Sequence, residues 1–245
     1  MITAILSALA EEQQGLLELL NQPRRVERAG RIFWQGELHG QPVVLALSRI
    51  GKVAAATTAT TLVEAFGAQR LVFTGVAGGI APGVQVGDVV VAREFVQHDM
   101  DASPLFPRYQ VPLYGRERFA CDTTLSSALI AATRSGLQQL GLGVALHHGL
   151  VASGDRFVSA AQEARDLHAA LNEAGHAPLA VEMEGAAVAQ VCHDYGIPFA
   201  AMRTISDRAD DTAHVDFPKF VNEVASRYAL AILDAFMREL QKQQS

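Results

Sequence analysis

Hydrophobic and polar positions divide most of the chain into short apolar runs and longer segments of helical periodicity. Apolar runs of about four to eight residues rich in valine, isoleucine and phenylalanine predict buried strands, and apolar residues spaced three and four apart predict helices. The predicted strands are Ile2–Leu9, Arg31–His39, Val43–Ser48, Arg70–Thr74, Asp88–Val96, Val144–Val151, Ala180–Glu184 and Pro198–Ile205. The predicted helices are Glu11–Leu20, Gly51–Phe66, Leu125–Leu140, Ala160–Leu171, a small-residue helix after Glu184, and a last helix from near Asp216.

Strands and helices alternate through the later chain, with an extra pair of strands near the start. This order predicts an α/β fold in which a mixed sheet is covered by helices on both faces. No Pro/Gly/Ser-rich or charged linker interrupts the chain, so residues 1–245 are predicted to form one domain. Residues 98–120 carry three prolines and no clear periodicity. Such a long loop is typical of a lid, a binding loop or an interface arm.

Carboxylates follow two consecutive predicted strands near the C-terminal end of the chain. Glu182 and Glu184 close one apolar strand, and Ser206-Asp207 closes the next. An ionised group at the end of a buried strand is costly unless pairing or function retains it. Ligands of open α/β sheets bind beyond the carboxyl ends of strands. We therefore expect Glu184 and Asp207 to face one pocket.

The amino-acid composition and net charge limit the kinds of molecule that the protein is expected to bind. The chain is 49% hydrophobic, with a net charge of −6 and an isoelectric point near 5.7. This balance disfavours nucleic acid or an anionic membrane as the main partner. No apolar run is long enough to span a bilayer, and the N-terminus lacks the basic region of a signal peptide. Two cysteines, Cys121 and Cys192, suggest free thiols in a reducing compartment, so we expect a cytoplasmic protein.

Several local signals have simpler readings than a ligand site. Glu11 and Glu12 suit the first turn of a helix by their charge alone. The stretch GVAGG lacks the Walker lysine, so it predicts close approach of backbone to a ligand at Ala77 and Gly78. The side chains of His147 and His148 are expected on opposite faces of a strand, which disfavours a shared metal ion. The side chains of Cys192 and His193 are expected to diverge on a helix, which disfavours a Cys-His nucleophile pair. Asp207, Asp210 and Asp211 do not complete a calcium loop. We expect no metal and no cofactor.

Six segments together resemble the bacterial 5′-methylthioadenosine/S-adenosylhomocysteine nucleosidases. They are SRIGKVAAA (48–56), TGVAGGI (74–80), VGDVVVA (86–92), SGDRFV (153–158), AVEMEGAAVA (180–189) and RTISDRAD (203–210). Glu12, in the first strand-to-helix turn, matches as well, and the resemblance covers roughly residues 2–240. It implies the nucleoside phosphorylase-like fold, a three-layer α/β/α domain, and hydrolysis of an N-glycosidic bond to release adenine.

The resemblance also implies roles for the catalytic residues. Asp207 would protonate adenine N7, with Ser206 orienting the carboxyl group or the base. Glu12 would hold and deprotonate the attacking water, and Arg203 would help to position that water or Glu184. Glu184 would bind the ribose hydroxyls. Such a pair of acid and base suits a reaction that passes through a ribosyl cation. Glu182 has no assigned chemical task and is expected to be structural.

The binding residues follow from the same resemblance. Phe157 would stack on adenine, the backbone at Val158 would read its edge, and Met183 would pack on the sugar. The 5′ end of the ligand is expected in an apolar slot, whose candidate walls are Ile50, Leu105, Phe106, Met183 and Phe217.

The small residues of helix 53–63 permit close helix approach, which predicts a homodimer. Family dimers lend an apolar loop residue to the neighbour's 5′ pocket. Here Phe106 or Pro112 is the expected donor.

One departure and two rival functions remain open. Many family members have serine where this chain has Val76, which puts one water contact in doubt. Valine also occurs in a branch that cleaves aminofutalosine, so this substrate and 5′-deoxyadenosine stay as alternatives. A nucleoside phosphorylase of the same fold would carry a phosphate-binding arginine after the first strand, where this chain has SALAEE. A non-catalytic nucleoside-binding protein would be expected to lose Glu12 or Asp207.

Overall fold

The computed structural model describes residues 1–13, 15–209 and 220–242. Its strands are β1 (Thr3–Ser7), β2 (Asn21–Arg28), β3 (Arg31–Leu38), β4 (Gln41–Leu47), β5 (Arg70–Gly79), β6 (Val89–Gln97), β7 (Arg118–Ala120), β8 (Leu146–Ser153), β9 (Pro178–Glu182) and β10 (Phe199–Asp207). They form one mixed sheet in the order β10-β6-β8-β9-β5-β1-β4-β3-β2, with β7 paired to β6. The mixed α/β class predicted from the sequence is confirmed.

The sheet bends back on itself at β5. This strand pairs with β1 and β10 in parallel and with β9 in antiparallel orientation. Because β10 also pairs with β6, the strands β5, β10, β6, β8 and β9 close a ring. The carboxyl ends of β5, β8, β9 and β10 are brought to one region by this closure, and that region holds the candidate site.

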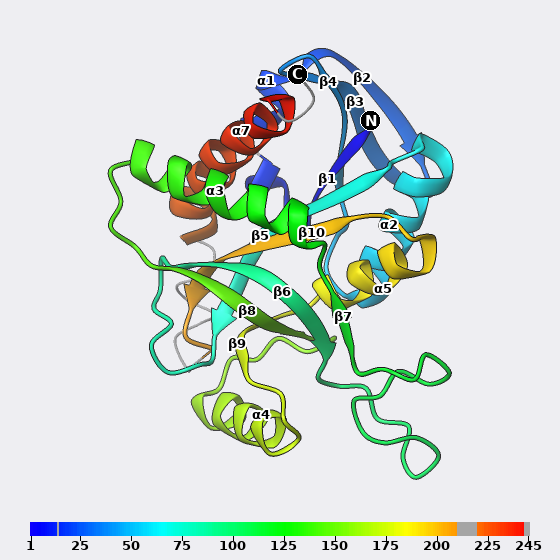
Figure 1. Cartoon of the computed structure of the whole chain (residues 1–245), viewed down its shortest axis with the longest axis vertical. Coiled ribbons are helices and arrows are strands. Elements are labelled where there is room, and N and C mark those ends of the chain that lie inside the picture. The colour runs from blue at the N-terminus through cyan, green and yellow to red at the C-terminus, as the bar shows by residue number, and fades with distance from the viewer. Residues whose placement is uncertain (14, 210–219, 243–245) are drawn as a thin grey trace.

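Helices cover both faces of the sheet (Figure 1). They are α1 (Leu16–Leu19), α2 (Lys52–Phe66), α3 (Thr123–Gln139), α4 (Ala161–Glu173), α5 (Gly185–Tyr195) and α7 (Ser226–Lys242), with the 3₁₀ turn η1 (Ala10–Gln13) and the π-helical stretch η2 (Val221–Ala225). Helix α3 packs with α7 on one face, and α2 packs with α5 on the other. Along β1, Ala4 and Leu6 enter the core beneath α2 and α5, whereas Ile5 enters the core beneath α3 and α7. Both faces of the strand are buried, which explains its continuous apolar sequence.

The first predicted helix is wrong as a single element. In place of Glu11–Leu20, the chain forms η1 and the four-residue helix α1 on either side of Gly15. Gly15 has a φ of 87°, in the left-handed region that an α-helix interior excludes. Strand β2 was not predicted, because its exposed, charged residues lack an alternating apolar face. It pairs with β3 at the edge of the sheet.

Two further boundaries differ from the sequence prediction. Strand β5 continues through the predicted glycine-rich turn to Gly79, where β9 and β10 pair with it. The long loop after β6 is confirmed, although its last three predicted residues form β7. This loop projects from the body at the lower right of Figure 1. The predicted start of the last helix, near Asp216, lies outside the described residues. Within the described residues, no helix has the length and apolar character needed to cross a membrane.

Candidate active site

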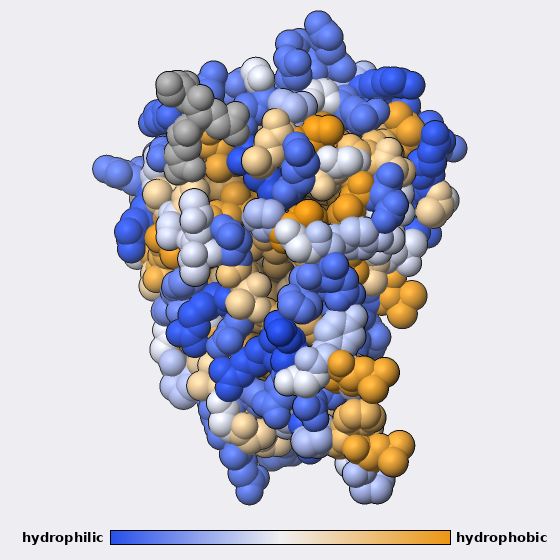
Figure 2. All heavy atoms as spheres, turned by 45° about the vertical axis from the view of Figure 1, so that its right-hand side comes forward, coloured by the Kyte–Doolittle hydropathy of each residue, from blue (hydrophilic) through white to orange (hydrophobic). Residues whose placement is uncertain are grey.

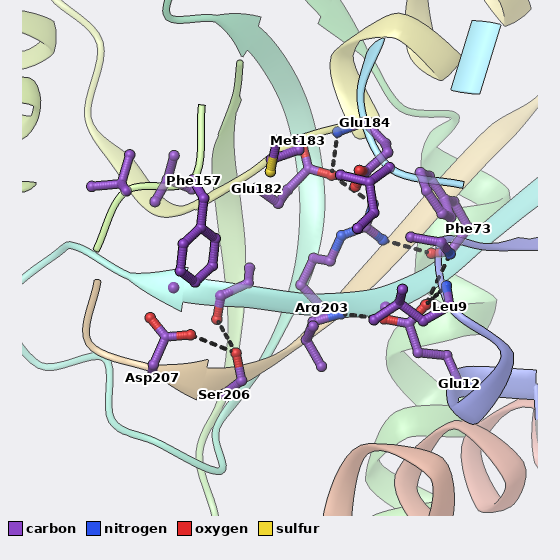
Figure 3. Close-up of a pocket in the computed structure, with 18 of the residues that line it drawn as sticks. Leu9, Glu12, Phe73, Phe157, Glu182, Met183, Glu184, Arg203, Ser206 and Asp207 are labelled. Carbon is purple, nitrogen blue, oxygen red and sulfur yellow. Dashed lines mark hydrogen bonds and ion pairs between the residues drawn. The ribbon is translucent and has the colours of Figure 1, made fainter. Parts of the chain in front are cut away.

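The loops and strand ends on this side of the sheet enclose a cavity of about 390 Å³ (Figure 3). Its lining residues are Ala8, Leu9, Glu12, Ile50, Phe73, Gly75, Val76, Ala77, Gly78, Arg156, Phe157, Val158, Val181, Glu182, Met183, Glu184, Arg203, Ser206 and Asp207. The expectation that Glu184 and Asp207 face one pocket is therefore confirmed. The same cavity contains Ile50, Ala77, Gly78, Phe157, Val158 and Met183, all predicted to bind substrate. Their individual roles remain predictions.

Glu12 lies at one end of the cavity, on the 3₁₀ turn η1. Its Oε2 accepts hydrogen bonds from the backbone N–H groups of Ala8 and Leu9, both at 2.9 Å, and its Oε1 accepts one from Val76 at 3.2 Å. Burial raises the pKa of Glu12 to about 7, although these N–H groups and Arg203 oppose the shift. A carboxyl group that titrates near neutrality is suited to accept a proton from water.

Arg203 lies in the middle of the site and is almost fully buried, with its guanidinium 4.0 Å from the ring centroid of Phe73. Its Nη2 donates to Glu182 Oε2 at 2.7 Å, and its Nη1 donates to the carbonyl groups of Phe73 and Met202. The resemblance implied that Arg203 helps to position the attacking water or Glu184, and this role stays a prediction. In the structure the guanidinium bonds Glu182, two residues before Glu184, and its charge also lowers the pKa of Glu184.

Glu182 holds the site together, as its expected structural role suggests. It accepts bonds from Ser153 Oγ and from the backbone N–H groups of Glu184 and Gly185, in addition to its ion pair with Arg203. The carboxylate therefore joins β8, β10 and the first turn of α5. A buried charge is retained at tolerable cost when it is paired and hydrogen-bonded in this way.

The sequence predicted that Glu184 ends a strand. In the structure β9 ends at Glu182, and Glu184 lies immediately before α5. Its Oε1 accepts a hydrogen bond of 2.8 Å from the backbone N–H of Gly51. Burial, followed by the nearby charge of Glu182, raises the pKa of Glu184 to about 8. Three carboxyl groups and one guanidinium thus share a small buried volume, and Glu182 takes the guanidinium.

Asp207 and Ser206 lie at the other end of the cavity, on the last residues of β10 (Figure 3). Asp207 Oδ2 accepts a bond of 2.7 Å from the Ser206 hydroxyl, and Oδ1 accepts one of 2.7 Å from the N–H of Ala209. A Cβ atom at Gly78 would lie 2.9 Å from Asp207 Oδ1. Glycine at position 78 therefore gives the carboxyl group its space.

Apolar side chains form part of the cavity wall, and two of them are open to solvent. Phe157 is 43% exposed and Ile50 is 56% exposed, whereas Val158 is buried. Met183 is half-buried between Glu182 and Glu184. The aromatic face, the thioether and the aliphatic side chain provide a surface that an uncharged planar base or an alkyl group can cover.

The loop residues proposed for the 5′ slot are not brought to this cavity within the chain. Leu105, Phe106 and Pro112 belong to the loop between β6 and β7 and are absent from the described lining residues. Leu105 and Leu113 on this loop are more than four-fifths exposed. Figure 2 shows a group of apolar residues on the surface at the lower right of that view. Phe217 lies outside the described residues.

Sequence reasoning missed the backbone groups of the site. Gly51 donates to Glu184, and Ala8 and Leu9 donate to Glu12, but an N–H group carries no sequence signal. Gly75 was also missed: a Cβ atom there would lie 3.1 Å from Glu12 Oε1 and 3.6 Å from the Arg203 guanidinium. The glycine after a buried apolar strand was the available signal.

The alternative metal and nucleophile sites find no support in geometry. His147 bonds Asp88 at 2.8 Å, whereas His148 is exposed. Cys192 is buried while His193 is exposed. Among residues 1–13, 15–209 and 220–242, no group of three or more His, Cys, Asp or Glu side chains is placed to hold a metal ion.

The chain is similar to known nucleosidases over most of its length. Residues 3–238 match the family model described as the phosphorylase superfamily. A 5′-methylthioadenosine/S-adenosylhomocysteine nucleosidase of Chromohalobacter salexigens is 36% identical, with 97% of each chain covered. An aminodeoxyfutalosine nucleosidase of Helicobacter pylori is 35% identical, over 90% of this chain and 92% of the relative.

Solved structures give the same result. The 5′-methylthioadenosine/S-adenosylhomocysteine nucleosidase of Neisseria meningitidis, in complex with methylthio-immucillin-A, superposes with a TM-score of 0.87. It is 35% identical and covers 96% of this chain and 97% of its own. Fold and sequence agree over almost the whole length. The chain therefore belongs to the phosphorylase superfamily and, within it, to the 5′-methylthioadenosine/S-adenosylhomocysteine nucleosidase family.

Proposed function

We propose that the protein hydrolyses the N-glycosidic bond of 5′-methylthioadenosine and S-adenosylhomocysteine and releases adenine. The observation that carries this proposal is the position of Glu12. Its buried carboxyl group is held by three backbone N–H groups at the end of the cavity opposite Asp207. A base and an acid at the two ends of one cavity are what addition of water across a glycosidic bond requires.

The proposed reaction begins with the departure of adenine. Asp207 donates its proton to N7 of the base as the bond between C1′ and N9 breaks, and the bonding electrons leave with adenine. The bond from Ser206 Oγ to Asp207 Oδ2 fixes the carboxyl group so that Oδ1 can face the base. Phe157 stacks on the ring, and the backbone at Val158 contacts its edge. Positioning of this kind lowers the entropic part of the barrier.

Water then completes the reaction at the sugar. Glu12 takes a proton from a water molecule as the water oxygen bonds to C1′ of the ribosyl cation. Glu184 accepts hydrogen bonds from the ribose hydroxyls, and its negative charge stabilises the cation as it forms. Met183 packs on the sugar. Arg203 acts on this step through its charge and through Glu182, to which it is bonded.

A nucleoside phosphorylase is the principal rival, because it shares the superfamily. Phosphate would have to enter the end of the cavity that already holds the carboxyl groups of Glu12, Glu182 and Glu184, and each of these that is ionised would repel it. The test is adenine release from 5′-methylthioadenosine with and without phosphate. We expect equal rates and free 5-methylthioribose. Acceleration by phosphate, with accumulation of a ribose 1-phosphate, would support the phosphorylase instead. No adenine release under either condition would support a nucleoside-binding protein.

Aminofutalosine and 5′-deoxyadenosine are proposed as further substrates. The Helicobacter pylori relative named for aminodeoxyfutalosine, together with Val76 in the cavity wall, supports the first. Both nucleosides present the same adenine and ribose groups to Asp207, Glu184 and Phe157, and they differ at the 5′ end. Adenine release from all four nucleosides, measured side by side, gives their order. We place the activity in methionine salvage, in the cytoplasm, with residues 1–245 acting as one domain.

We further propose that the enzyme is a homodimer. The outer wall of the cavity is open at Ile50 and Phe157, and the start of α2 exposes 78% of Val53. A second copy would cover these side chains and supply Phe106 or Pro112 from its loop between β6 and β7. Sedimentation at micromolar concentration should give twice the chain mass of 26.2 kDa. A fully active monomer would contradict both the dimer and the shared pocket.

A further inference from the structure

Three segments that adjoin lining residues of the cavity are joined by a closed ring of polar contacts. The backbone N–H of Lys52 donates to Asp155 Oδ1 at 2.7 Å, and the backbone N–H of Asp155 donates to Asp99 Oδ2 at 2.9 Å. Lys52 Nζ closes the ring with a bond of 2.6 Å to Asp99 Oδ1. Lys52 begins α2, Asp99 follows β6, and Asp155 follows β8, so the ring joins segments that are distant in sequence.

The ring is connected to Glu184 through one residue. Gly51 precedes Lys52 and donates its N–H to Glu184 Oε1. Gly51 has a φ of 97°, which side chains other than glycine rarely adopt, and a Cβ atom there would lie 3.1 Å from Asp155 Oδ1. The turn that aims this N–H at Glu184 is therefore packed directly against the ring.

The ring is connected to Phe157 on its other side. Asp155 lies two residues before Phe157 and three before Val158, on the loop between β8 and α4. The imidazole of His98 packs directly against Gly154 on this loop. A Cβ atom at Gly154 would lie 2.3 Å from the imidazole, so glycine leaves the space that His98 fills. Lys52 Nζ also donates to Gln97, whose amide group bonds Gln190 on α5. The loop therefore packs on His98, and Lys52 is also connected to α5 through Gln97.

The ring of contacts is only partly exposed to solvent. The Lys52 side chain is 15% exposed and the Asp99 side chain is 32% exposed. Both carboxylate oxygens of Asp99 accept a bond, and its partners and burial differ from those of an isolated surface pair. Exposed ion pairs contribute little to stability, so three loops held by one partly buried network suggest a role in geometry.

We propose that Lys52, Asp99 and Asp155 form a positioning clamp that holds the ribose-binding Glu184, through Gly51, in register with the base-stacking Phe157. None of the three side chains lines the described cavity, so they act through the two residues that do. This inference rests on the proposed nucleosidase function. Its consequence is that the sugar and the base are bound as one rigid unit, because both contacts depend on the same ring.

The test compares Lys52→Met, Asp99→Asn and Asp155→Ala with the wild-type enzyme, using 5′-methylthioadenosine as substrate. Loss of the clamp should lower kcat/KM on the order of tenfold or more, with a rise in KM, since small displacements of positioning groups cost rates of this size. Asp155→Asn keeps an oxygen that can accept from Lys52, so it should recover most of the activity that Asp155→Ala loses. Lys242→Met removes an exposed lysine at the end of α7 and should leave kcat and KM unchanged.

The pH profile separates positioning from a purely structural role. The N–H of Gly51 lowers the pKa of Glu184, which also faces Glu182, Arg203 and Glu12. Loosening Gly51 should therefore move the acidic limb of kcat/KM to higher pH in the three clamp variants. A lower melting temperature with unchanged KM and an unchanged pH profile would overturn the clamp.

The three substitutions lie in three different segments of the chain. If one variant fails to fold, the other two still test the same ring of contacts. An inactive wild-type enzyme would contradict the proposed function. Active wild-type enzyme with unaffected variants would contradict the clamp alone.

Discussion

The buried inner surface of the cavity and its exposed wall are built on different principles. On the inner surface, Glu12, Glu184, Arg203 and Asp207 are each less than a tenth exposed, and each has hydrogen bonds to groups of the same chain. On the exposed wall, Phe157 and Ile50 keep about half of their surface exposed. The inner surface is polar and hydrogen-bonded, whereas the exposed wall is apolar and open.

This difference has a physical cause. A buried charge without partners costs several kcal/mol, so the hydrogen bonds of the polar inner surface have to be satisfied within the folded chain before any ligand arrives. An exposed apolar side chain costs far less and can wait for a ligand or a second subunit to cover it. We therefore expect changes at the buried carboxyl groups to lower turnover, and changes at the open wall to alter substrate preference.

The largest effect is expected from the two carboxyl groups assigned to proton transfer. Asp207→Asn keeps the shape of the side chain but removes the acid, and turnover should fall on the order of 10²-fold or more. Glu12→Gln should behave similarly, because the attacking water loses its base. Binding of 5′-methylthioadenosine, measured by calorimetry on the slow variants, should change much less. Turnover near the wild-type value would remove the altered residue from the mechanism.

A smaller effect is expected at the open wall. If the 5′ slot is apolar, 5′-methylthioadenosine should exceed adenosine in kcat/KM on the order of tenfold, since a buried methyl or methylene group contributes roughly 0.8 kcal/mol and a hydroxyl group would lose its water. The measurement is a comparison of the two nucleosides under identical conditions. Equal or better cleavage of adenosine would mean that polar groups line the slot.

The smallest effect concerns the stability of the ligand-free enzyme. Burial raises the pKa of Glu12 to about 7 and that of Glu184 to about 8, from 4.5 for an ordinary glutamate. Above pH 4.5 the native state therefore holds more protons than the unfolded chain, and the free energy of unfolding falls as pH rises through 7 to 8. His98 and His176 titrate below this window, because burial lowers the pKa of each.

Urea unfolding between about pH 6.5 and 8.5 measures this dependence. We expect a loss on the order of 1 kcal/mol or more, shared between the two coupled groups. Glu184→Gln should flatten the slope. Stability that increases with pH over this interval in the wild-type enzyme would show that the inner carboxyl groups are ionised when the cavity is empty.

Regular elements with a strong pattern were predictable from the sequence. Continuous apolar runs identified β1, β4, β6 and β10, and spaced apolar residues identified α2, α3 and α4 to within a few positions. Prediction failed where tertiary contacts override local preference. Gly15 interrupts a segment of good helix formers, and β2 forms from exposed charged residues because β3 offers it an edge.

The chain order also predicted which side chains share the pocket. Asp207 ends β10 and Glu184 follows the end of β9 by two residues, and the carboxyl ends of strands in one sheet meet at one edge. The order of residues along the chain does not predict which of two neighbouring carboxylates forms an ion pair with Arg203. Glu182 and Glu184 are two residues apart and chemically identical, yet one bonds Arg203 and the other bonds Gly51. That choice depends on side-chain directions, which are decided only when β10, β9 and the start of α5 come together around the site.

The sequence by itself determined the alternation of elements, the apolar core and the residue types available for acid–base chemistry, because these are properties of local pattern and composition. The tertiary structure decided the closed ring of strands, the burial that raises the pKa values of Glu12 and Glu184, and the clamp around Gly51. The physical reason is that burial, charge pairing and backbone hydrogen bonds depend on distances between segments remote in sequence. Such distances exist only once the chain has folded.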